Sequence, residues 1–373
     1  MQMKSSLMFA VIRPLLITQI LIILVVKAFY IMILNLIKEG QSMIIPASND
    51  FLVKIFNQYS TGKVKEITKR ELYDYSLYSM LEFIAFDNID EIYVLKTLKR
   101  PVKHEIEIHK FVNNFAINGA HFIAGYSSDF LNLHFIIMEY IKDISPVYNY
   151  DDKELVEFYA ELAKNLGLLH VNSKKYIQSL KKNNIIEFSL KYYDDLLDKF
   201  AEKLPMLSAE IKNDLYLTPD IIEQFLQKKE LIKKKLLRIQ NLRRTLVHGD
   251  FDVGNIFLRP INNNEKKIMA IDWGLSHIDL PIVDMANLLN SLKILSSDDR
   301  NYILESYLKI AQKEFPKNYS LNNFQDLGMM LHRLFFIEFQ LNTLETSSNS
   351  VDEYYEQIHN ALVSLTDLVE KID

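Results

Sequence analysis

The alternation of apolar and polar stretches predicts a β-hairpin in the second half of the chain. Residues 256–258 and 268–271 are apolar, and three consecutive asparagines at 262–264 lie between them. Two apolar runs around such a cluster are typical of paired strands joined by a turn. A turn centred between the last two asparagines would place Asn255 opposite Asp272 at the open end of the hairpin, with Cβ atoms roughly 5 Å apart.

The same patterns predict strands before this hairpin and helices around it. Residues 78–86 and 91–98 are apolar runs around a polar turn, and residues 133–138 form an apolar run typical of a buried strand. Residues 153–171 carry apolar side chains at helical spacing, and residues 185–245 are mostly helical in pattern. Further helices are predicted over residues 282–295, 299–314, 323–344 and 352–372.

Oxygen-bearing side chains gather at the entrance of the predicted hairpin. The amide oxygen of Asn255 and the carboxylate of Asp272 would be close enough to hold one Mg²⁺, a hard cation that takes oxygen ligands. Asp250 lies five residues before Asn255, where it can accept the proton of an attacking hydroxyl group. The plainer interpretation is a surface hairpin in which Asp and Asn residues form turns and helix caps.

The motifs around this hairpin resemble those of a known enzyme family. His248-Gly249-Asp250 with Asn255, followed by Ile271-Asp272-Trp273 and by Pro281-Ile282-Val283-Asp284-Met285-Ala286, is similar to the aminoglycoside phosphotransferase and choline kinase family. The resemblance covers residue 44 to the C-terminus and is strongest over residues 246–289. It implies an α+β, two-lobed protein-kinase-like fold, with a small, mainly β N-terminal lobe at residues 43–139 and a larger helical lobe at residues 140–373.

The resemblance also implies an ATP site with Mg²⁺ as its metal. Lys96 would hold the ATP phosphates and pair with Glu105, or with Glu107 as the fallback. A lysine on an otherwise buried strand is costly unless its charge is paired, although a lysine on an edge strand can also reach solvent. Backbone groups of Glu139 and Ile141 would bind adenine in the hinge between the lobes, although the same residues also fit an ordinary core strand.

Two further residues receive structural roles, and one feature departs from the family pattern. His248 is expected to fix the loop by a hydrogen bond, and Asp284 matches the acid that braces the catalytic loop in the family. Kinase-like folds usually cover the phosphates with a glycine-rich loop, because glycine lets the backbone approach closely. No glycine occurs between Ile67 and Phe83, and residues 75–79 occupy the turn instead.

The composition of the chain bears on its size, its binding partners and its cellular compartment. The chain has 373 residues and is 49% hydrophobic, enough for two lobes that each have a core. Its net charge of −5 argues against a general nucleic-acid binder. It has no cysteine, so we expect a cytoplasmic protein without a disulfide framework.

The N-terminal segment, residues 1–42, has three open interpretations. Residues 7–37 are strongly apolar but are interrupted by Arg13 and Lys27, and the longest uncharged run has 13 residues. That is shorter than the ~18 residues of a confident membrane span. The segment is either translated upstream DNA before a true start at Met43, a membrane anchor through residues 7–37, or an added helix. Contact with a membrane is expected only if residues 1–42 are real.

The sequence therefore predicts an ATP-dependent phosphotransferase that acts on a hydroxyl group of a small molecule. Aminoglycoside-, choline- and sugar-like acceptors all remain open. Acidic residues in the last helix fit either a cationic acceptor or a solvated helix face. A protein kinase is disfavoured because Gly249 replaces the arginine that would contact an activation-loop phosphate. A regulatory pseudokinase stays open because the glycine-rich loop is missing.

Overall fold

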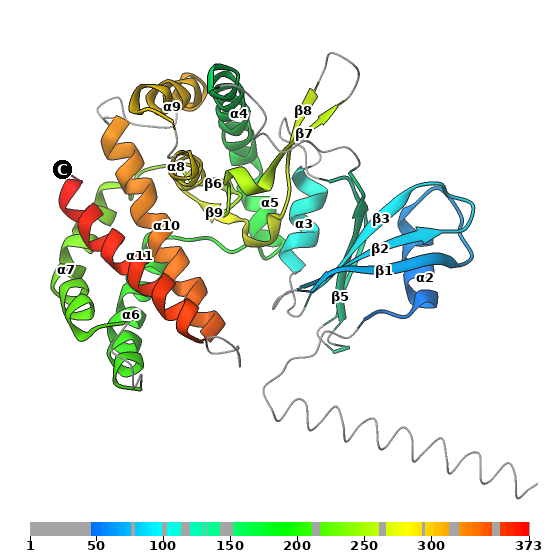
Figure 1. Cartoon of the computed structure of the whole chain (residues 1–373), viewed down its shortest axis with the longest axis horizontal. Helices are drawn as coiled ribbons and strands as arrows, with labels where there is room; N and C mark the ends of the chain where they lie inside the picture. Colours follow the sequence, from blue (N-terminus) through cyan, green and yellow to red (C-terminus); the bar gives the residue numbers. More distant parts are fainter. Residues whose placement is uncertain are drawn as a thin grey trace, which may run out of the picture.

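A β-rich lobe comes first in the chain and a larger, mainly helical lobe follows (Figure 1). The computed structural model describes residues 46–75, 79–98, 103–112, 120–128, 130–131, 133–141, 152–210, 217–260, 266–292, 295–312, 321–344 and 351–372. This arrangement confirms the predicted α+β, kinase-like fold. The apolar segment at residues 7–37 and the β1–β2 turn at residues 76–78 lie outside the described residues.

The first lobe is built on an antiparallel sheet. Its strand order among the described residues is β1-β2-β3-β5-β4, so the fourth strand lies at an edge and the fifth strand inside. The predicted hairpin around residues 87–90 is confirmed as β2 and β3, with Asn88 at φ 60° in its turn, a left-handed conformation that Asn tolerates. The strands are β1 (Ile67–Tyr75), β2 (Ser79–Phe86), β3 (Ile92–Leu98), β4 (Phe122–Ser128) and β5 (Leu133–Glu139).

Helices cover both faces of this sheet, which explains the continuous apolar run in β5. Helix α2 (Asn49–Tyr59) packs on one face, and α3 (Lys103–Val112) lies between the other face and the helical lobe (Figure 1). Phe135 and Ile137 belong to the apolar cluster beside α2, whereas Ile136 belongs to the cluster beside α3. Successive side chains of a strand point to opposite faces, so a strand covered on both sides is apolar throughout.

The same alternation sets the direction of Lys96 on β3. Leu95 is fully buried in the cluster beside α2, and Leu98 is in the cluster beside α3. Because Lys96 lies one position after Leu95 and two before Leu98, its side chain points toward α3. The strand period therefore brings a cation to the face that meets the second lobe.

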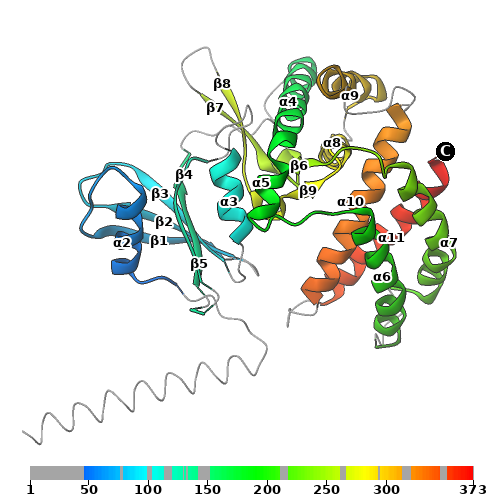
Figure 2. The ribbon, with the colours of Figure 1, turned by 180° about the vertical axis from the view of Figure 1, so that it is seen from behind.

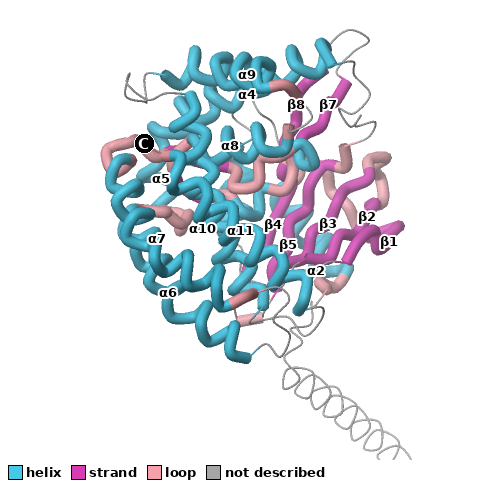
Figure 3. The backbone as a smooth tube through the Cα atoms, turned by 60° about the vertical axis from the view of Figure 1, so that its left-hand side comes forward, coloured by secondary structure: helices cyan, strands magenta, loops and turns pink. Residues whose placement is uncertain are grey.

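The second lobe is a set of helices with the two-stranded sheet β7-β8 at its edge toward the larger sheet (Figure 3), and it contains a second two-stranded sheet, β6-β9. One continuous apolar cluster joins its helices, and α4 and α9 run side by side in both views of the ribbon (Figures 1 and 2). None of the described helices is both long and apolar enough to cross a membrane. The elements are α4 (Asp152–Ser173), α5 (Ile177–Lys182), α6 (Leu190–Glu210), α7 (Pro219–Arg238), β6 (Thr245–Val247), β7 (Ile256–Pro260), β8 (Lys266–Ala270), β9 (His277–Asp279), α8 (Ile282–Ser291), α9 (Ser297–Ala311), α10 (Leu321–Leu344) and α11 (Val351–Lys371).

Helix α8 lies against α10 at a position where a glycine is required. A Cβ on Gly328 would lie 2.5 Å from the carbonyl oxygen of Ile282 and 2.6 Å from the Cβ of Ala286. Both distances are far below van der Waals contact, and the first involves backbone that cannot move aside. The close approach fixes the position of α8, which carries the buried Asp284.

We expect Gly328→Ala to lower the free energy of unfolding by about 2 kcal/mol, because an added methyl group in a closed contact forces the helices apart. Urea denaturation measures the change. Gly62→Ala is the control, since a Cβ there meets only the Ile89 side chain at 3.6 Å. Equal stability of the two variants would show that the α8–α10 contact is not tight in solution.

Candidate active site

Lys96 makes ion pairs with carboxylates from two distant parts of the chain. Its Nζ lies 2.8 Å from Oε1 of Glu105 on α3 and 3.0 Å from Oδ1 of Asp272, which follows the hairpin of the second lobe. The Lys96 and Glu105 side chains are 12% and 1% exposed, whereas that of Asp272 is 58% exposed. The trio therefore links a strand, a helix and the other lobe, with its open side at Asp272.

Charge pairing outweighs burial for both buried members of the trio. Burial alone would lower the pKa of Lys96, but the charges of Glu105 and Asp272 raise it overall. Burial would raise the pKa of Glu105, but Lys96 and the nearby His109 outweigh it and bring that pKa to about 2. Both groups are therefore charged at neutral pH. Glu107, the fallback partner, pairs with Lys110 on the surface of α3 instead.

The loop after β6 is held by His248 and by a left-handed glycine. The imidazole of His248 is fully buried; its Nε2 lies 2.8 Å from the carbonyl oxygen of Ile271, and its ring packs on Trp273. Gly249 has φ +85°, and a Cβ there would collide with the Leu275 carbonyl oxygen. Such a conformation favours glycine. His248 thus occupies a structural position beside the hairpin, and the turn at Gly249 directs the chain into Asp250.

Asp250 is held by Asn255, a contact that the sequence did not predict. The Asn255 amide nitrogen donates to the backbone oxygen of Asp250 at 2.9 Å and to its carboxylate Oδ2 at 3.1 Å. Burial raises the pKa of Asp250, and the negative charges of Asp252 and Asp272 add to that effect. Because its nitrogen is used by Asp250, Asn255 keeps its amide oxygen for another partner.

The predicted hairpin exists, but its predicted register is wrong by one residue. Ile256 pairs with Ala270, and the Ile271 N–H donates to the carbonyl oxygen of Asn255 at 3.0 Å, so Asn255 faces Ile271 and not Asp272. The prediction assumed a turn centred between two residues, whereas five residues, 261–265, separate the strands. Asp272 lies one position further, in a left-handed conformation with φ 57°.

The segment after β5 joins the two lobes. The N–H groups of Glu139 and Tyr140 donate to the carbonyl oxygens of His121 and Ile92, and neither bond uses the carbonyl of Glu139 or the N–H of Ile141. Ile141 is buried with Ala120 and with Met269 of β8, and Met138 and Ile271 pack against them. An apolar cluster therefore connects the hinge to the residue that precedes Asp272.

The Glu139 side chain makes contacts that the sequence did not predict. Its carboxylate forms an ion pair with Arg259 on β7, and its other oxygen accepts from the His121 N–H at 3.4 Å. Both charged side chains line a cavity of about 1010 Å³ behind the hinge. This cavity includes none of Lys96, Asp250 or Asp272, so it lies apart from the charged site.

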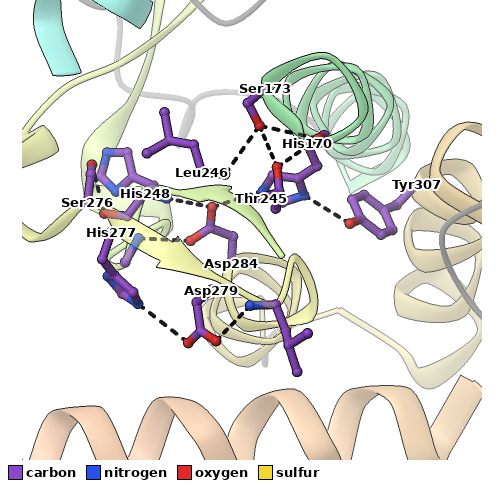
Figure 4. Close-up of polar contacts among 12 residues, drawn as sticks. His170, Ser173, Thr245, Leu246, His248, Ser276, His277, Asp279, Asp284 and Tyr307 are labelled. Carbon is purple, nitrogen blue, oxygen red and sulfur yellow. Dashed lines mark hydrogen bonds and ion pairs between the residues drawn. The ribbon is translucent and has the colours of Figure 1, made fainter. Parts of the chain in front are cut away.

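Asp284 braces the loop from below (Figure 4). It is fully buried, and its oxygens accept from the backbone N–H of His248 at 2.7 Å and of Gly249 at 2.9 Å. It also lies 3.2 Å from Nε2 of His170, a residue of α4. The sequence pattern pointed to Asp284 but gave no signal for His170, which occupies an ordinary position in an apolar helix.

The ion pair of Lys96 should contribute strongly to stability. We expect Glu105→Gln to lower the free energy of unfolding by about 3 kcal/mol, because it leaves a buried lysine without its buried counterion. Glu107→Gln, on the exposed side of the same helix, should change it by less than about 0.5 kcal/mol. Chemical denaturation at neutral pH measures both variants, and similar losses would contradict the assignment.

The stability of the wild type relative to Glu105→Gln should also depend on pH. The folded-state pKa of Glu105 is about 2, below the ordinary value of 4.5, so the unfolded chain binds more protons between these values. The contribution of the carboxylate is therefore full above about pH 5 and is lost as the pH falls through that window. Denaturation of both proteins from about pH 6 to about pH 3 should show a narrowing difference; a constant difference would be inconsistent with the pairing.

Comparison with known proteins places this geometry in a family. Residues 92–314 match the phosphotransferase enzyme family, and no curated protein matches the sequence. Among solved structures, a protein from Ralstonia eutropha JMP134 described as an aminoglycoside phosphotransferase is 14% identical with a TM-score of 0.61, covering 86% of this chain and 97% of that one.

Two further solved structures share the fold at similarly low sequence identity. Choline kinase from Cryptosporidium parvum Iowa II is 18% identical with a TM-score of 0.55, covering 86% of this chain and 96% of its own. An aminoglycoside 2″-phosphotransferase solved with GDP and kanamycin is 12% identical with a TM-score of 0.54, and the match covers 86% of this chain and 98% of that one. Since the family match spans more than half of its length, this chain belongs to the phosphotransferase enzyme family.

Proposed function

We propose that this chain transfers the γ-phosphoryl group of ATP to a hydroxyl group of a small molecule. The observation that carries the proposal is the ion-paired trio at the meeting of the lobes. Lys96 and Glu105 come from the first lobe, and Asp272 comes from the second. Asp250, whose pKa is raised in part by the charge of Asp272, lies in the same electrostatic environment. Positioning and charge stabilisation supply most of the catalysis in phosphoryl transfer.

The hinge is the proposed site for the nucleotide base. The carbonyl of Glu139 and the N–H of Ile141 would bind adenine, with Met138 behind it. Support comes from the bonds of the Glu139 and Tyr140 N–H groups, which involve neither of these two groups, and from the apolar side chains around Ile141. Proteins of similar fold have been solved with AMP and with GDP. Lys96 would then contact the phosphates, with Glu105 holding its ammonium group in place.

The residues around Asp272 fit Mg²⁺. The Asp272 carboxylate is more than half exposed, and Asn255 has an amide oxygen whose partner nitrogen is already bonded to Asp250. Magnesium takes hard oxygen ligands and is usually bound by one or two side chains together with phosphates and water. The described residues contain no group of three or more His, Asp or Glu that could hold a metal, so phosphate and water would supply the other ligands. Bound Mg²⁺ would neutralise charge on the phosphates.

Asp250 is the proposed catalytic base. Its carboxylate is held by Asn255 and lies mostly buried beside other negative charge, which raises its pKa. A raised pKa makes a carboxylate a better proton acceptor. In this role it would orient the acceptor hydroxyl and take its proton as the bond to phosphorus forms.

The acceptor is proposed to be a small alcohol of the aminoglycoside, choline or sugar type. The solved structures of similar fold include proteins named for aminoglycosides, choline and ethanolamine, and all three of these compounds are cationic at neutral pH. A chain with net charge −5 suits a cationic acceptor better than a nucleic acid. The use of ATP and the absence of cysteine from the sequence suit the cytoplasm.

Replacing the base tests the proposal directly. We expect Asp250→Asn to reduce ADP formation from MgATP by at least ~10²-fold, because the amide cannot accept the proton. Asp252→Asn is the matched control: it removes a nearby negative charge but keeps the Asp250 carboxylate, and the cap on the Gly254 N–H is a bond that an amide oxygen retains. Turnover of Asp250→Asn within about fivefold of that control would remove Asp250 from the mechanism.

The metal assignment predicts a different kinetic change. Asn255→Ala should raise the Mg²⁺ concentration needed for half-maximal turnover by about tenfold, since it removes a metal ligand. Asp250→Asn should leave this concentration nearly unchanged while it lowers the maximal rate. Mg²⁺ titrations at fixed ATP measure both quantities. An unaltered Mg²⁺ requirement in Asn255→Ala would mean that Asn255 serves only to hold Asp250.

A further inference from the structure

We infer that His170 and Tyr307 are positioning residues for the catalytic loop and act on it through Asp284. This inference rests on the proposed phosphotransfer, because it assigns a role within the same site. The residues come from α4 and α9, helices that lie behind the loop (Figure 4). Neither residue is part of the charged site itself, so both would act through the backbone that carries Asp250.

The chain of contacts begins at Asp284. Its Oδ2 accepts from the His248 N–H and lies 3.2 Å from Nε2 of His170, while its Oδ1 accepts from the Gly249 N–H. Burial would raise the pKa of Asp284, but the hydrogen bond from His170 and the backbone bond from the loop lower it overall. His332 of α10 also faces this carboxylate, but burial lowers its pKa to about 4, which leaves it uncharged at neutral pH.

The orientation of the His170 ring follows from its neighbours. An ionised carboxylate only accepts hydrogen bonds, so Nε2 of His170 must carry the proton that faces Asp284. Its Nδ1 lies 2.9 Å from the hydroxyl of Tyr307, and in the neutral ring this nitrogen accepts from that hydroxyl. His170 is 3% exposed and Tyr307 fully buried. The three side chains form a directed chain from α9 to the loop.

The backbone of His170 is tied to the strand that enters the same loop. Its carbonyl oxygen accepts from the hydroxyl of Thr245 at 2.7 Å and from that of Ser173 at 3.2 Å. The Ser173 hydroxyl in turn accepts from the Leu246 N–H at 3.2 Å and contacts the Thr245 hydroxyl. Since Thr245 and Leu246 belong to β6, which leads directly into His248, the end of α4 is fixed to the strand that enters the turn.

A glycine allows α9 to come close enough for the contact. A Cβ on Gly167 would lie 3.0 Å from Cβ of Ile310 and 3.2 Å from the carbonyl oxygen of Tyr307. Gly167 precedes His170 by one helical turn, on the same face of α4. The helices can therefore pack at the short separation that places the Tyr307 hydroxyl on the imidazole.

These contacts do more than fill the protein core, because they fix the direction of the loop that begins at His248. The two oxygens of Asp284 bind successive N–H groups at the left-handed turn of Gly249. Without the His170 donor, rotation of the carboxylate would release one of those groups and let the turn relax. Asp250 follows directly, and small displacements of a reacting group have large effects on rate. Lys96 and the hinge are held by other contacts, so nucleotide affinity should be preserved.

The first test compares two tyrosines of the same helix. Tyr307→Phe removes only the hydroxyl on His170, whereas Tyr302→Phe removes a hydroxyl 3.3 Å from Glu157 of α4 at the exposed end of the same helix pair. We expect Tyr307→Phe to lower kcat for ADP formation by about tenfold with KM for ATP within about twofold, as a displaced catalytic group predicts. Tyr302→Phe should match the wild type. Equal kcat values for the two variants would overturn the inference.

The second test uses His170 itself. His170→Ala should lower kcat by on the order of 10²-fold, and His170→Gln should recover at least about tenfold of that loss, because a glutamine amide can donate to Asp284. A purely structural role predicts that kcat follows thermal stability across the variants. Equal kcat in the alanine and glutamine variants would therefore contradict a positioning role.

An NMR measurement of the His170 ring tests this inference independently of the proposed function. The ¹⁵N shifts of His170, assigned by comparison with His170→Gln, should show a neutral ring protonated at Nε2 near neutral pH. A ring protonated at Nδ1, or at both nitrogens, would refute the directed chain. If the wild type forms no ADP, the proposed function fails while the ring assignment stands on its own. If the wild type is active and Tyr307→Phe equals Tyr302→Phe, only the positioning role fails.

Discussion

The buried ammonium group of Lys96 is the constraint on which the arrangement of this molecule depends. A lysine that is 12% exposed requires partners of opposite charge, and here they come from α3 and from the loop after β8. To meet them, the sheet must present the correct face of β3, α3 must lie against that face, and the second lobe must bring Asp272 within 3.0 Å. One cation thus fixes the placement of two neighbouring segments of the first lobe and of one distant segment of the second.

A second buried charge organises the other side of the site. Asp284 has no lysine or arginine among the partners described above and is satisfied instead by two loop N–H groups and an imidazole. Buried carboxylates persist only when their oxygens are fully bonded, so Asp284 and the loop at His248 and Gly249 stabilise each other. In the proposed reaction the two charged groups have different roles. Lys96 contacts the nucleotide, and Asp284 holds the loop that carries the base. Binding of MgATP would require Lys96 and Asp272 to exchange their mutual contact for phosphate and metal.

Local sequence patterns predicted the strands and helices that carry the candidate site residues. The hairpin register and the long-range contacts depend on tertiary packing and were not predicted. The β2–β3 and β7–β8 hairpins, α4 and the late helices follow from apolar spacing. The Lys96–Glu105 pair was implied by the resemblance to the family, and the cost of an unpaired buried lysine only required some partner. The register of β7 and β8 was wrong because one residue in the length of a loop shifts every pairing, and the sequence does not show which residues belong to the turn. Helix α2 and strands β1 and β4 were not predicted, since β1 is mostly polar and β4 contains Gly125 and two serines. The contacts of Arg259, His170 and Tyr307 are with residues distant in sequence, and no local sequence pattern reveals such contacts.

The central claim is that these charges form a site for phosphoryl transfer rather than for nucleotide binding alone. The most direct measurement is ³¹P NMR of the purified chain with MgATP and, in separate samples, an aminoglycoside, choline, ethanolamine and a hexose. The account predicts that at least one sample develops a phosphomonoester resonance in step with ADP, and that Asp250→Asn abolishes it. Binding of MgATP by the wild type with no ester and no ADP in any sample would contradict the account and favour a regulatory nucleotide-binding protein.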